Sequence, residues 1–126
     1  MSEISALIVD DSSVMRKIVE RALRQSGLAI TEVFEASNGL EALDVLRRAR
    51  VDLILSDINM PNMDGLEFLR QMRAQELAPD VPVVMITTEG SEDHVREAIV
   101  AGAQGYIRKP FTAEQVKERV LPLIET

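Results

Sequence analysis

The sequence predicts an α/β fold in which five strands alternate with five helices. Short runs of aliphatic residues recur along the 126 residues, and a segment with helical spacing of apolar residues follows each run. No internal repeat and no Pro/Gly/Ser-rich linker interrupts this alternation. We therefore expect one domain that spans residues 1–126.

The expected strands are of two kinds. Residues 6–9, 51–56 and 81–87 are almost continuously Val, Ile or Leu, which is typical of strands buried on both faces of a parallel sheet. Residues 30–36 and 105–108 carry more polar side chains. We therefore expect these two strands, the second and the fifth, at the edges of the sheet.

This placement of the edge strands predicts the topology. Right-handed crossovers between parallel strands put helices on both faces of the sheet. With strands 2 and 5 at the edges, the strand order is 2-1-3-4-5, the flavodoxin-like arrangement of a doubly wound sheet. Ligands of such sheets bind at the carboxyl ends of the strands, where the order reverses between strands 1 and 3.

Helix starts are marked by capping residues. The first helix is expected over residues 12–26, and a fourth begins near Ser91. The other three should follow Asn38, Asp64 and Thr112, each of which has Glu or Gln three residues later, as in a capping box. In the last helix, Pro122 removes a backbone donor, and we expect the helix to kink or end there.

The apolar residues of each helix should form the face that packs on the sheet. The expected apolar positions are Val14, Ile18 and Leu23 in the first helix, Leu40, Leu43 and Leu46 in the second, Leu66, Leu69 and Met72 in the third, Val95, Ala98 and Ile99 in the fourth, and Val116 and Val120 in the fifth.

Composition excludes several classes of function. The chain has no Cys and one His, which excludes a disulfide scaffold, a thiolate zinc site, a thiol nucleophile and a multi-His metal site. A formal net charge of −7 argues against direct nucleic-acid binding. No apolar run approaches the ~20 residues of a membrane span, and the N-terminus lacks a signal peptide, so we expect a cytoplasmic protein without membrane contact.

Acidic residues meet at the expected ligand-binding edge. Strand 1 ends in Asp10 and Asp11, and strand 3 ends in Asp57. Neighbouring strands lie about 4.8 Å apart, so these carboxylates should crowd together and require a retained proton or a bound cation. Oxygen ligands without Cys or His suit Mg²⁺, with Mn²⁺ or Ca²⁺ as possible substitutes.

Two further groups point to phosphoryl chemistry. Lys109 is the one Lys of three at a strand end, and Thr87 ends strand 4 with a hydroxyl. A divalent ion, an ammonium and a hydroxyl around a carboxylate are suited to stabilising a phosphoryl group in transfer, with Asp57 as the nucleophile. Taken singly, such residues are more commonly helix caps, strand residues or solvated surface, so the hypothesis depends on their convergence.

Four segments carry a resemblance to a known family: LIVDDS at residues 7–12, DINMPNMDG at 57–65, ITT at 86–88 and GYIRKPF at 105–111. In this order and spacing they resemble the receiver domain of two-component response regulators, in particular the single-domain chemotaxis regulators. The resemblance covers essentially the whole chain.

The resemblance implies a role for each matching residue. It implies that Asp57 is the phosphoacceptor, that Asp10 and Asp11 serve Mg²⁺ together with the backbone carbonyl of Asn59, and that Lys109 pairs with the phosphoryl group. It further implies that Thr87 is the switch hydroxyl, that Tyr106 is the aromatic that turns inward, and that Asn59 and Glu89 tune the reset rate. In this family the Lys109–Pro110 bond is commonly cis.

The resemblance also implies partners. A histidine kinase or a small phosphodonor supplies the phosphoryl group, and a protein target binds the face made by helix 4, strand 5 and helix 5. Such a protein is a switch rather than an enzyme, catalysing only its own phosphorylation and dephosphorylation, and it is expected to be a monomer or weak dimer.

Other functions of the same fold are disfavoured. A flavin carrier needs a Ser/Thr/Gly loop after strand 1, where this chain has Asp10 and Asp11. An aspartate-nucleophile phosphatase requires a second acidic residue two positions after its nucleophile, and in this chain the position two residues after Asp57 is Asn59. A receiver cut from a longer regulator and a non-phosphorylated interaction module remain alternatives to a stand-alone switch.

Overall fold

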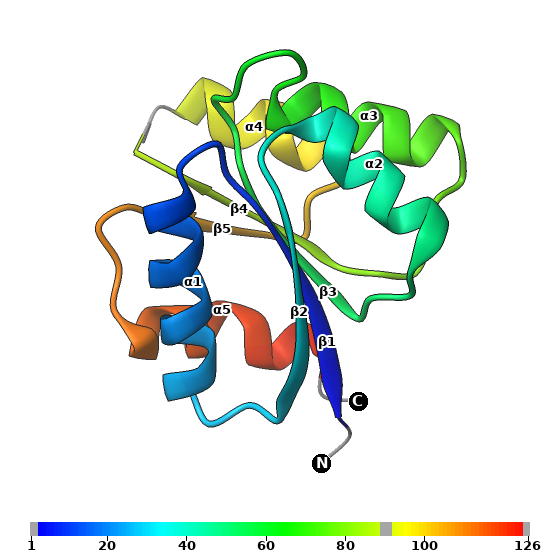
Figure 1. The fold of residues 1–126 in the computed structure, drawn as a ribbon. Helices are drawn as coiled ribbons and strands as arrows, with labels where there is room; N and C mark the ends of the chain where they lie inside the picture. Colours follow the sequence, from blue (N-terminus) through cyan, green and yellow to red (C-terminus); the bar gives the residue numbers. More distant parts are fainter. Residues whose placement is uncertain (1–2, 89–91, 125–126) are drawn as a thin grey trace.

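The computed structural model describes residues 3–88 and 92–124 (Figure 1). Strands and helices alternate along the described chain, as the aliphatic runs predict. In chain order they are β1 (Ile4–Val9), α1 (Ser13–Gln25), β2 (Ile30–Ala36), α2 (Gly39–Arg48), β3 (Leu53–Asp57), α3 (Gly65–Ala74), β4 (Val83–Thr87), α4 (Glu92–Val100), β5 (Gly105–Arg108) and α5 (Ala113–Ile124).

The strands form one parallel sheet in the order β2-β1-β3-β4-β5, which confirms the predicted flavodoxin-like topology. The more polar strands, β2 and β5, lie at the edges as expected. The register pairs Val9 with Ser56 and Asp57 with Ile86, so the ends of β1, β3 and β4 meet at one edge. β3 begins two residues later than predicted and includes Asp57, and β4 likewise begins at Val83.

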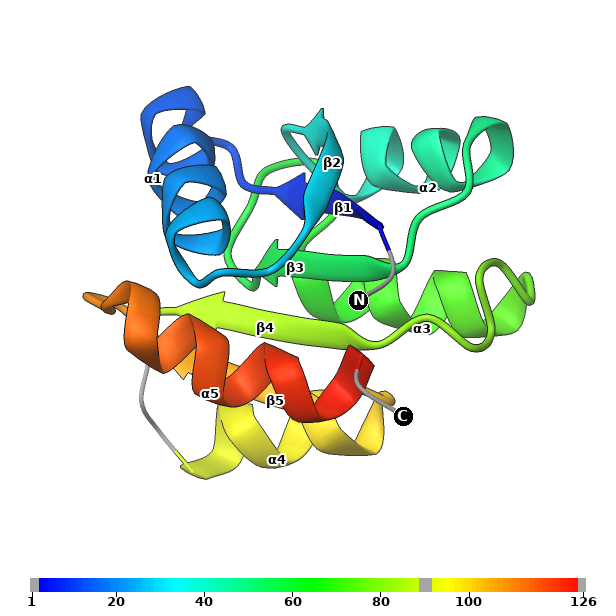
Figure 2. The same cartoon turned by 90° about the horizontal axis from the view of Figure 1, so that it is seen from below.

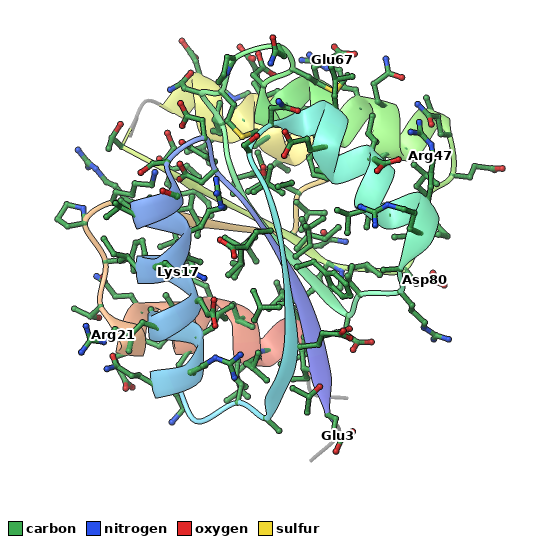
Figure 3. All side chains as sticks on the ribbon, in the orientation of Figure 1. Glu3, Lys17, Arg21, Arg47, Glu67 and Asp80 are labelled. Atoms are coloured by element: carbon green, nitrogen blue, oxygen red, sulfur yellow. The ribbon has the colours of Figure 1, made fainter. Side chains whose placement is uncertain are left out.

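Helices cover both faces of the sheet. Helices α1 and α5 pack on one face, and α2, α3 and α4 pack on the other (Figures 1 and 2). Each face has its own hydrophobic core: Leu23 and Val116 belong to the first, and Phe68 and Met72 to the second. Charged side chains such as Glu3 lie on the outside of this arrangement (Figure 3).

The N-caps predicted at Asn38, Asp64 and Thr112 are confirmed, whereas Ser91, near which the fourth helix was expected to begin, lies outside the described residues. The side chains of Asn38, Asp64 and Thr112 accept hydrogen bonds from the backbone N–H three residues on, at 2.9, 2.8 and 3.1 Å. Ser12 rather than Asp11 caps α1, since its Oγ accepts from the backbone N–H of Met15. Asp11 is therefore not used as the helix cap.

Several predicted core positions are wrong. The side chains of Val14, Ile18, Leu40 and Ile99 are 68%, 47%, 53% and 62% exposed. Successive residues of a helix are rotated by about 100°, so a face centred on the buried residues Val19, Ala22 and Leu23 turns Ile18 and Val14 toward solvent. Apolar character alone did not locate the centre of the buried face.

We expected α5 to kink or end at Pro122, and of these two outcomes the ending is wrong, because the helix continues to Ile124. Pro122 is exposed. A proline has no N–H, so one backbone carbonyl in the preceding turn lacks its helical hydrogen bond, but at this exposed surface that carbonyl can bond to water instead. The loss of this one hydrogen bond is therefore outweighed by the packing of the apolar residues at the end of the helix.

Candidate functional site

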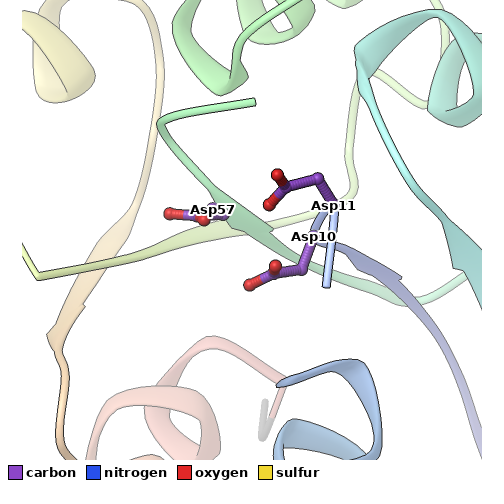
Figure 4. A group of neighbouring side chains, drawn as sticks. All are labelled: Asp10, Asp11 and Asp57. Atoms are coloured by element: carbon purple, nitrogen blue, oxygen red, sulfur yellow. The ribbon is translucent and has the colours of Figure 1, made fainter. Parts of the chain in front are cut away.

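Three acidic side chains converge at the carboxyl ends of β1 and β3 (Figure 4). Each of Asp10, Asp11 and Asp57 offers a carboxylate oxygen, and these three oxygens lie within 4.8 Å of one another. Asp10 is buried, Asp57 is half-buried, and Asp11 is exposed. The cluster is therefore open to solvent on the side of Asp11, and a ligand can reach it from that side.

Lys109 connects two of these carboxylates. Its Nζ lies 3.1 Å from Oδ2 of Asp10 and 3.5 Å from Oδ2 of Asp57, and its side chain is only 11% exposed. The backbone N–H of Lys109 donates to the carbonyl of Thr87 at 2.9 Å, which ties the residue following β5 to the end of β4. The Lys109–Pro110 peptide bond is cis, as expected.

Asp10 is fixed at three of its oxygen atoms. Oδ1 accepts a hydrogen bond from the backbone N–H of Ser12 at 2.9 Å, and Oδ2 accepts one from Lys109. The backbone carbonyl of Asp10 accepts a third, from Nη1 of Arg16 at 2.6 Å. A carboxylate this buried requires such partners, because an unpaired buried charge is costly.

The environment of Asp57 disfavours its ionised form. Burial raises the pKa of the Asp57 carboxyl above its ordinary value, and the neighbouring charge of Asp10 raises it further. The ammonium of Lys109 and the backbone N–H of Ile58, which donates to Oδ1 at 2.8 Å, lower the pKa but do not cancel the effect of burial. A bound cation would relieve this unfavourable ionisation.

The turn after β3 brings another backbone segment against Asp57. The N–H of Gly65 donates to the carbonyl of Ile58 at 2.7 Å. A β-carbon at position 65 would collide with the backbone carbonyl of Asp57 and come within 2.8 Å of the terminal methyl of Met85. Glycine is therefore required here by close approach.

The remaining predicted residues lie at different depths. Thr87 is fully buried at the end of β4, next along the chain from Ile86, which pairs with Asp57. Tyr106 is half-buried and packs against the core on the α2–α3–α4 face. Asn59 is exposed in the turn after β3, and Glu89 lies outside the described residues.

Sequence reasoning did not single out two contacts of this site. One is Gly65, for which the signal was the Asp64–Gly65 pair at the start of α3. The other is Arg16, whose signal was weaker: a long basic side chain one helical turn after the capping Ser12 can reach back toward the turn that precedes it.

Comparison with known proteins decides the family. The family model of the response regulator receiver domain matches residues 6–121. The chain belongs to this family. It is 43% identical over 119 residues to the chemotaxis protein CheY of Pseudomonas aeruginosa, covering 94% of both chains, and 44% identical over 119 residues to the chemotaxis protein CheY-3 of Vibrio cholerae, covering 94% of this chain and 90% of that one.

Solved structures of receivers agree with the fold. The chemotaxis protein CheY4 of Vibrio cholerae superposes with a TM-score of 0.84 at 37% identity, over 98% of this chain and 99% of that one. The signal receiver domain of the putative response regulator NarL from Mycobacterium tuberculosis superposes with a TM-score of 0.87 at 30% identity, over 99% and 98%.

A receiver of this CheY-like type is a signalling switch rather than a conventional enzyme, and membership implies a phosphoacceptor role in two-component signalling. None of the described helices has the length and apolar character that a bilayer span requires.

Proposed function

We propose that this receiver accepts a phosphoryl group from a histidine kinase, or from a small phosphodonor, on Asp57. The observation that carries the proposal is the position of Lys109, whose ammonium lies between the carboxylates of Asp10 and Asp57 with Asp11 beside them. One ammonium against three carboxylates leaves a net negative cluster, which favours binding of a further cation.

The donor set fits Mg²⁺. The three carboxylates offer oxygen ligands only, within 4.8 Å of one another, and one of them is open to solvent. Asp10, Asp11, Asp57 and the backbone carbonyl of Asn59 would hold the ion, with Mn²⁺ or Ca²⁺ as substitutes. When bound, Mg²⁺ would neutralise charge on the phosphoryl oxygens.

The protein groups have separate roles in the transfer. A carboxylate oxygen of Asp57 attacks phosphorus as the bond from phosphorus to the donor breaks, and the electron pair of that bond returns to the donor. Oδ1 accepts a hydrogen bond from the backbone N–H of Ile58 at 2.8 Å, whereas Oδ2 lies at the longer distance of 3.5 Å from Nζ of Lys109, so we assign the attack to Oδ2 as the less tightly held oxygen. Lys109 then pairs with the phosphoryl oxygens, and the hydroxyl of Thr87 donates to one of them.

The buried position of Thr87 supports its role as the switch. A hydroxyl that moves toward the phosphoryl group would vacate space beside β5, and Tyr106 would turn inward to occupy it. This change would bias the face formed by α4, β5 and α5, where a downstream protein target binds. Water attack on the acyl phosphate resets the switch, at a rate that Asn59 and Glu89 tune.

The relatives named as chemotaxis proteins favour a stand-alone receiver in chemotaxis or another phosphorelay. We propose that residues 1–126 form one domain, active in the cytoplasm as a monomer or weak dimer, without direct contact with nucleic acid or membrane. A receiver that belongs to a longer regulator, and a non-phosphorylated interaction module, are the alternatives.

Intact-mass spectrometry tests the proposal. The wild-type protein and the variant Asp57→Asn are each incubated with acetyl phosphate, with and without Mg²⁺. Asp64→Asn is the matched control, because it makes the same chemical change outside the cluster and keeps a residue that caps helices well. A single phosphoryl adduct that requires both Mg²⁺ and Asp57, and that Asp64→Asn retains, is expected. An adduct on Asp57→Asn, or Mg²⁺ binding without any adduct from acetyl phosphate or a kinase, would contradict it.

A further inference from the structure

We propose that Arg16 is a positioning residue for the acidic cluster, fixing the backbone of Asp10 so that the cluster can bind Mg²⁺; this inference rests on the proposed function. Arg16 bridges two groups. Its Nη1 donates to the backbone carbonyl of Asp10 at 2.6 Å, and its Nε donates to Oε1 of Glu35 at 2.9 Å.

These contacts join three segments near the cluster. Arg16 lies in α1, Asp10 directly follows β1, and Glu35 lies near the end of β2. The N–H of Asp10 donates to the carbonyl of Ala36 at 3.0 Å, so the backbone of Asp10 is held on its N–H side by β2 and on its carbonyl side by Arg16. The side chains of Asp10 and Asp11 leave the backbone at this restrained point.

The guanidinium is itself held in place. The side chain of Arg16 is 16% exposed. Burial opposes ionisation of Glu35, but hydrogen bonds from Arg16 and Lys17 outweigh it and lower the pKa of the Glu35 carboxyl. Glu35 therefore stays ionised at neutral pH and keeps a charged partner on Nε while Nη1 remains directed at Asp10. The planar fork of Arg suits two such partners, whereas a Lys ammonium does not.

Charge and positioning predict opposite effects on Mg²⁺ binding. A positive charge beside a cation site repels the cation, so removing the charge of Arg16 should by itself tighten Mg²⁺ binding. Loss of positioning should weaken it, because groups that orient metal ligands are worth roughly 10–100-fold in affinity. We expect positioning to dominate, with the Kd for Mg²⁺ rising about tenfold in Arg16→Met.

Lys17 provides the matched control. It neighbours Arg16 in α1, and its Nζ lies 3.2 Å from Oε2 of the same Glu35. Its side chain is 67% exposed, and within the described part of the chain it pairs with Glu20 and Glu35 but not with Asp10. Lys17→Met removes the same charge from the same carboxylate. It should leave the Kd for Mg²⁺ within about twofold of the wild-type value, since exposed charges interact weakly.

The test is a Mg²⁺ titration of the full chain by calorimetry, with the free energy of unfolding of each variant measured by urea. A weaker Mg²⁺ affinity in Arg16→Met than in Lys17→Met, measured where both are fully folded, is the expected result. Arg16→Lys keeps the charge but not the fork, and we expect it to be weakened too. If Arg16→Met does not fold, Arg16→Lys and Glu35→Gln carry the same comparison.

Two negative outcomes are distinguishable. An equal or tighter Kd in Arg16→Met, with only its stability reduced, would overturn the positioning role and leave the proposed function standing. Failure of the wild-type chain to bind Mg²⁺ would instead overturn the proposed function itself, and this inference with it.

Discussion

The ammonium nitrogen of Lys109 lies 3.1 Å from Oδ2 of Asp10, although the two residues follow strands β5 and β1, which are separated in the sheet by β3 and β4. The backbone of Lys109 is hydrogen-bonded to Thr87 at the end of β4, and from there the side chain reaches past Asp57 at the end of β3 to Asp10. The contact joins the edge strand to the centre of the acidic cluster, so the charge of Lys109 bears on both stability and cation binding.

Replacing Lys109 should therefore change these two properties in opposite directions. Lys109→Met leaves Asp10 and Asp57 close together without their cation, and we expect the free energy of unfolding at neutral pH without Mg²⁺ to fall by about 3 kcal/mol. The same change removes a competing positive charge, so Mg²⁺ should bind more tightly. Urea unfolding and a Mg²⁺ titration measure the two effects.

The exposed Lys117 on α5 gives the control for this pair of measurements. Lys117→Met removes the same charge far from the strand ends and should change neither quantity appreciably. A Lys109→Met protein that bound Mg²⁺ more weakly than the wild type would show that Lys109 supports the cation site rather than competing with it.

The raised pKa of Asp57 predicts how stability depends on pH. Because the folded state binds this proton more tightly than the unfolded chain, ionisation of Asp57 costs stability as pH rises from the ordinary value of 3.8 through the folded pKa. Asp57→Asn should therefore be more stable than the wild type at neutral pH without Mg²⁺, and the difference should vanish below about pH 3.8.

Thermal unfolding across this pH range measures the difference, with the exposed Asp80→Asn as control. The control should not show the same pH-dependent gain. A gain for Asp57→Asn that persisted unchanged at low pH would point to packing of the amide rather than to the cost of a buried charge.

Gly65 tests the close approach beside Asp57. In Gly65→Ala the new methyl meets the Asp57 carbonyl and Met85, and relief of that overlap must shift the backbone of the nucleophile. We expect a loss of about 1–3 kcal/mol in the free energy of unfolding, together with weaker Mg²⁺ binding. Both are read by urea unfolding with and without the ion.

Gly27→Ala is the control for Gly65→Ala, because it introduces backbone strain at a glycine far from the acidic cluster. Gly27 has φ +88°, a conformation that L residues rarely adopt, but a β-carbon there meets nothing within 4 Å. It should cost about 1 kcal/mol of stability and leave Mg²⁺ binding unchanged. Equal effects of both variants on Mg²⁺ binding would argue against a local role for Gly65.

The convergence of Asp10, Asp57 and Lys109 was predictable because parallel topology alone brings strand ends to one edge. The helix N-cap at Asn38 was predictable for a different reason, because a cap depends only on residues close to it in the sequence. The contact of Arg16 was not predictable, since it depends on which rotamer a long side chain adopts and on a backbone carbonyl that every residue has.

Burial on the helices was predicted only in part for a different reason. Apolar spacing indicates a face but not where its centre lies, and a rotation of a fraction of a turn exposes a residue at its margin. Ile99 is exposed while the adjacent Ala98 is buried. The rotation of α4 about its own axis is therefore set by its packing against neighbouring elements, and the sequence of the helix alone does not specify those contacts.

The last prediction concerns the coupling between Thr87 and Tyr106. The chain has one Tyr and no Trp, so its intrinsic tyrosine fluorescence reports on Tyr106 alone. Tyr106 is half-buried against the core, and an inward turn of its ring on phosphorylation would change that environment. We expect acetyl phosphate with Mg²⁺ to change the emission of the wild type, and Asp57→Asn to show no change.

Thr87→Ala removes the hydroxyl that would carry the signal but leaves the nucleophile in place. It should still form the phosphoryl adduct detected by mass, while the emission of Tyr106 stays at its unphosphorylated value. An adduct accompanied by the full wild-type change in emission would show that Tyr106 responds to phosphorylation without Thr87. Lys109, whose backbone is hydrogen-bonded to the same end of β4, would then be the next group to test by substitution.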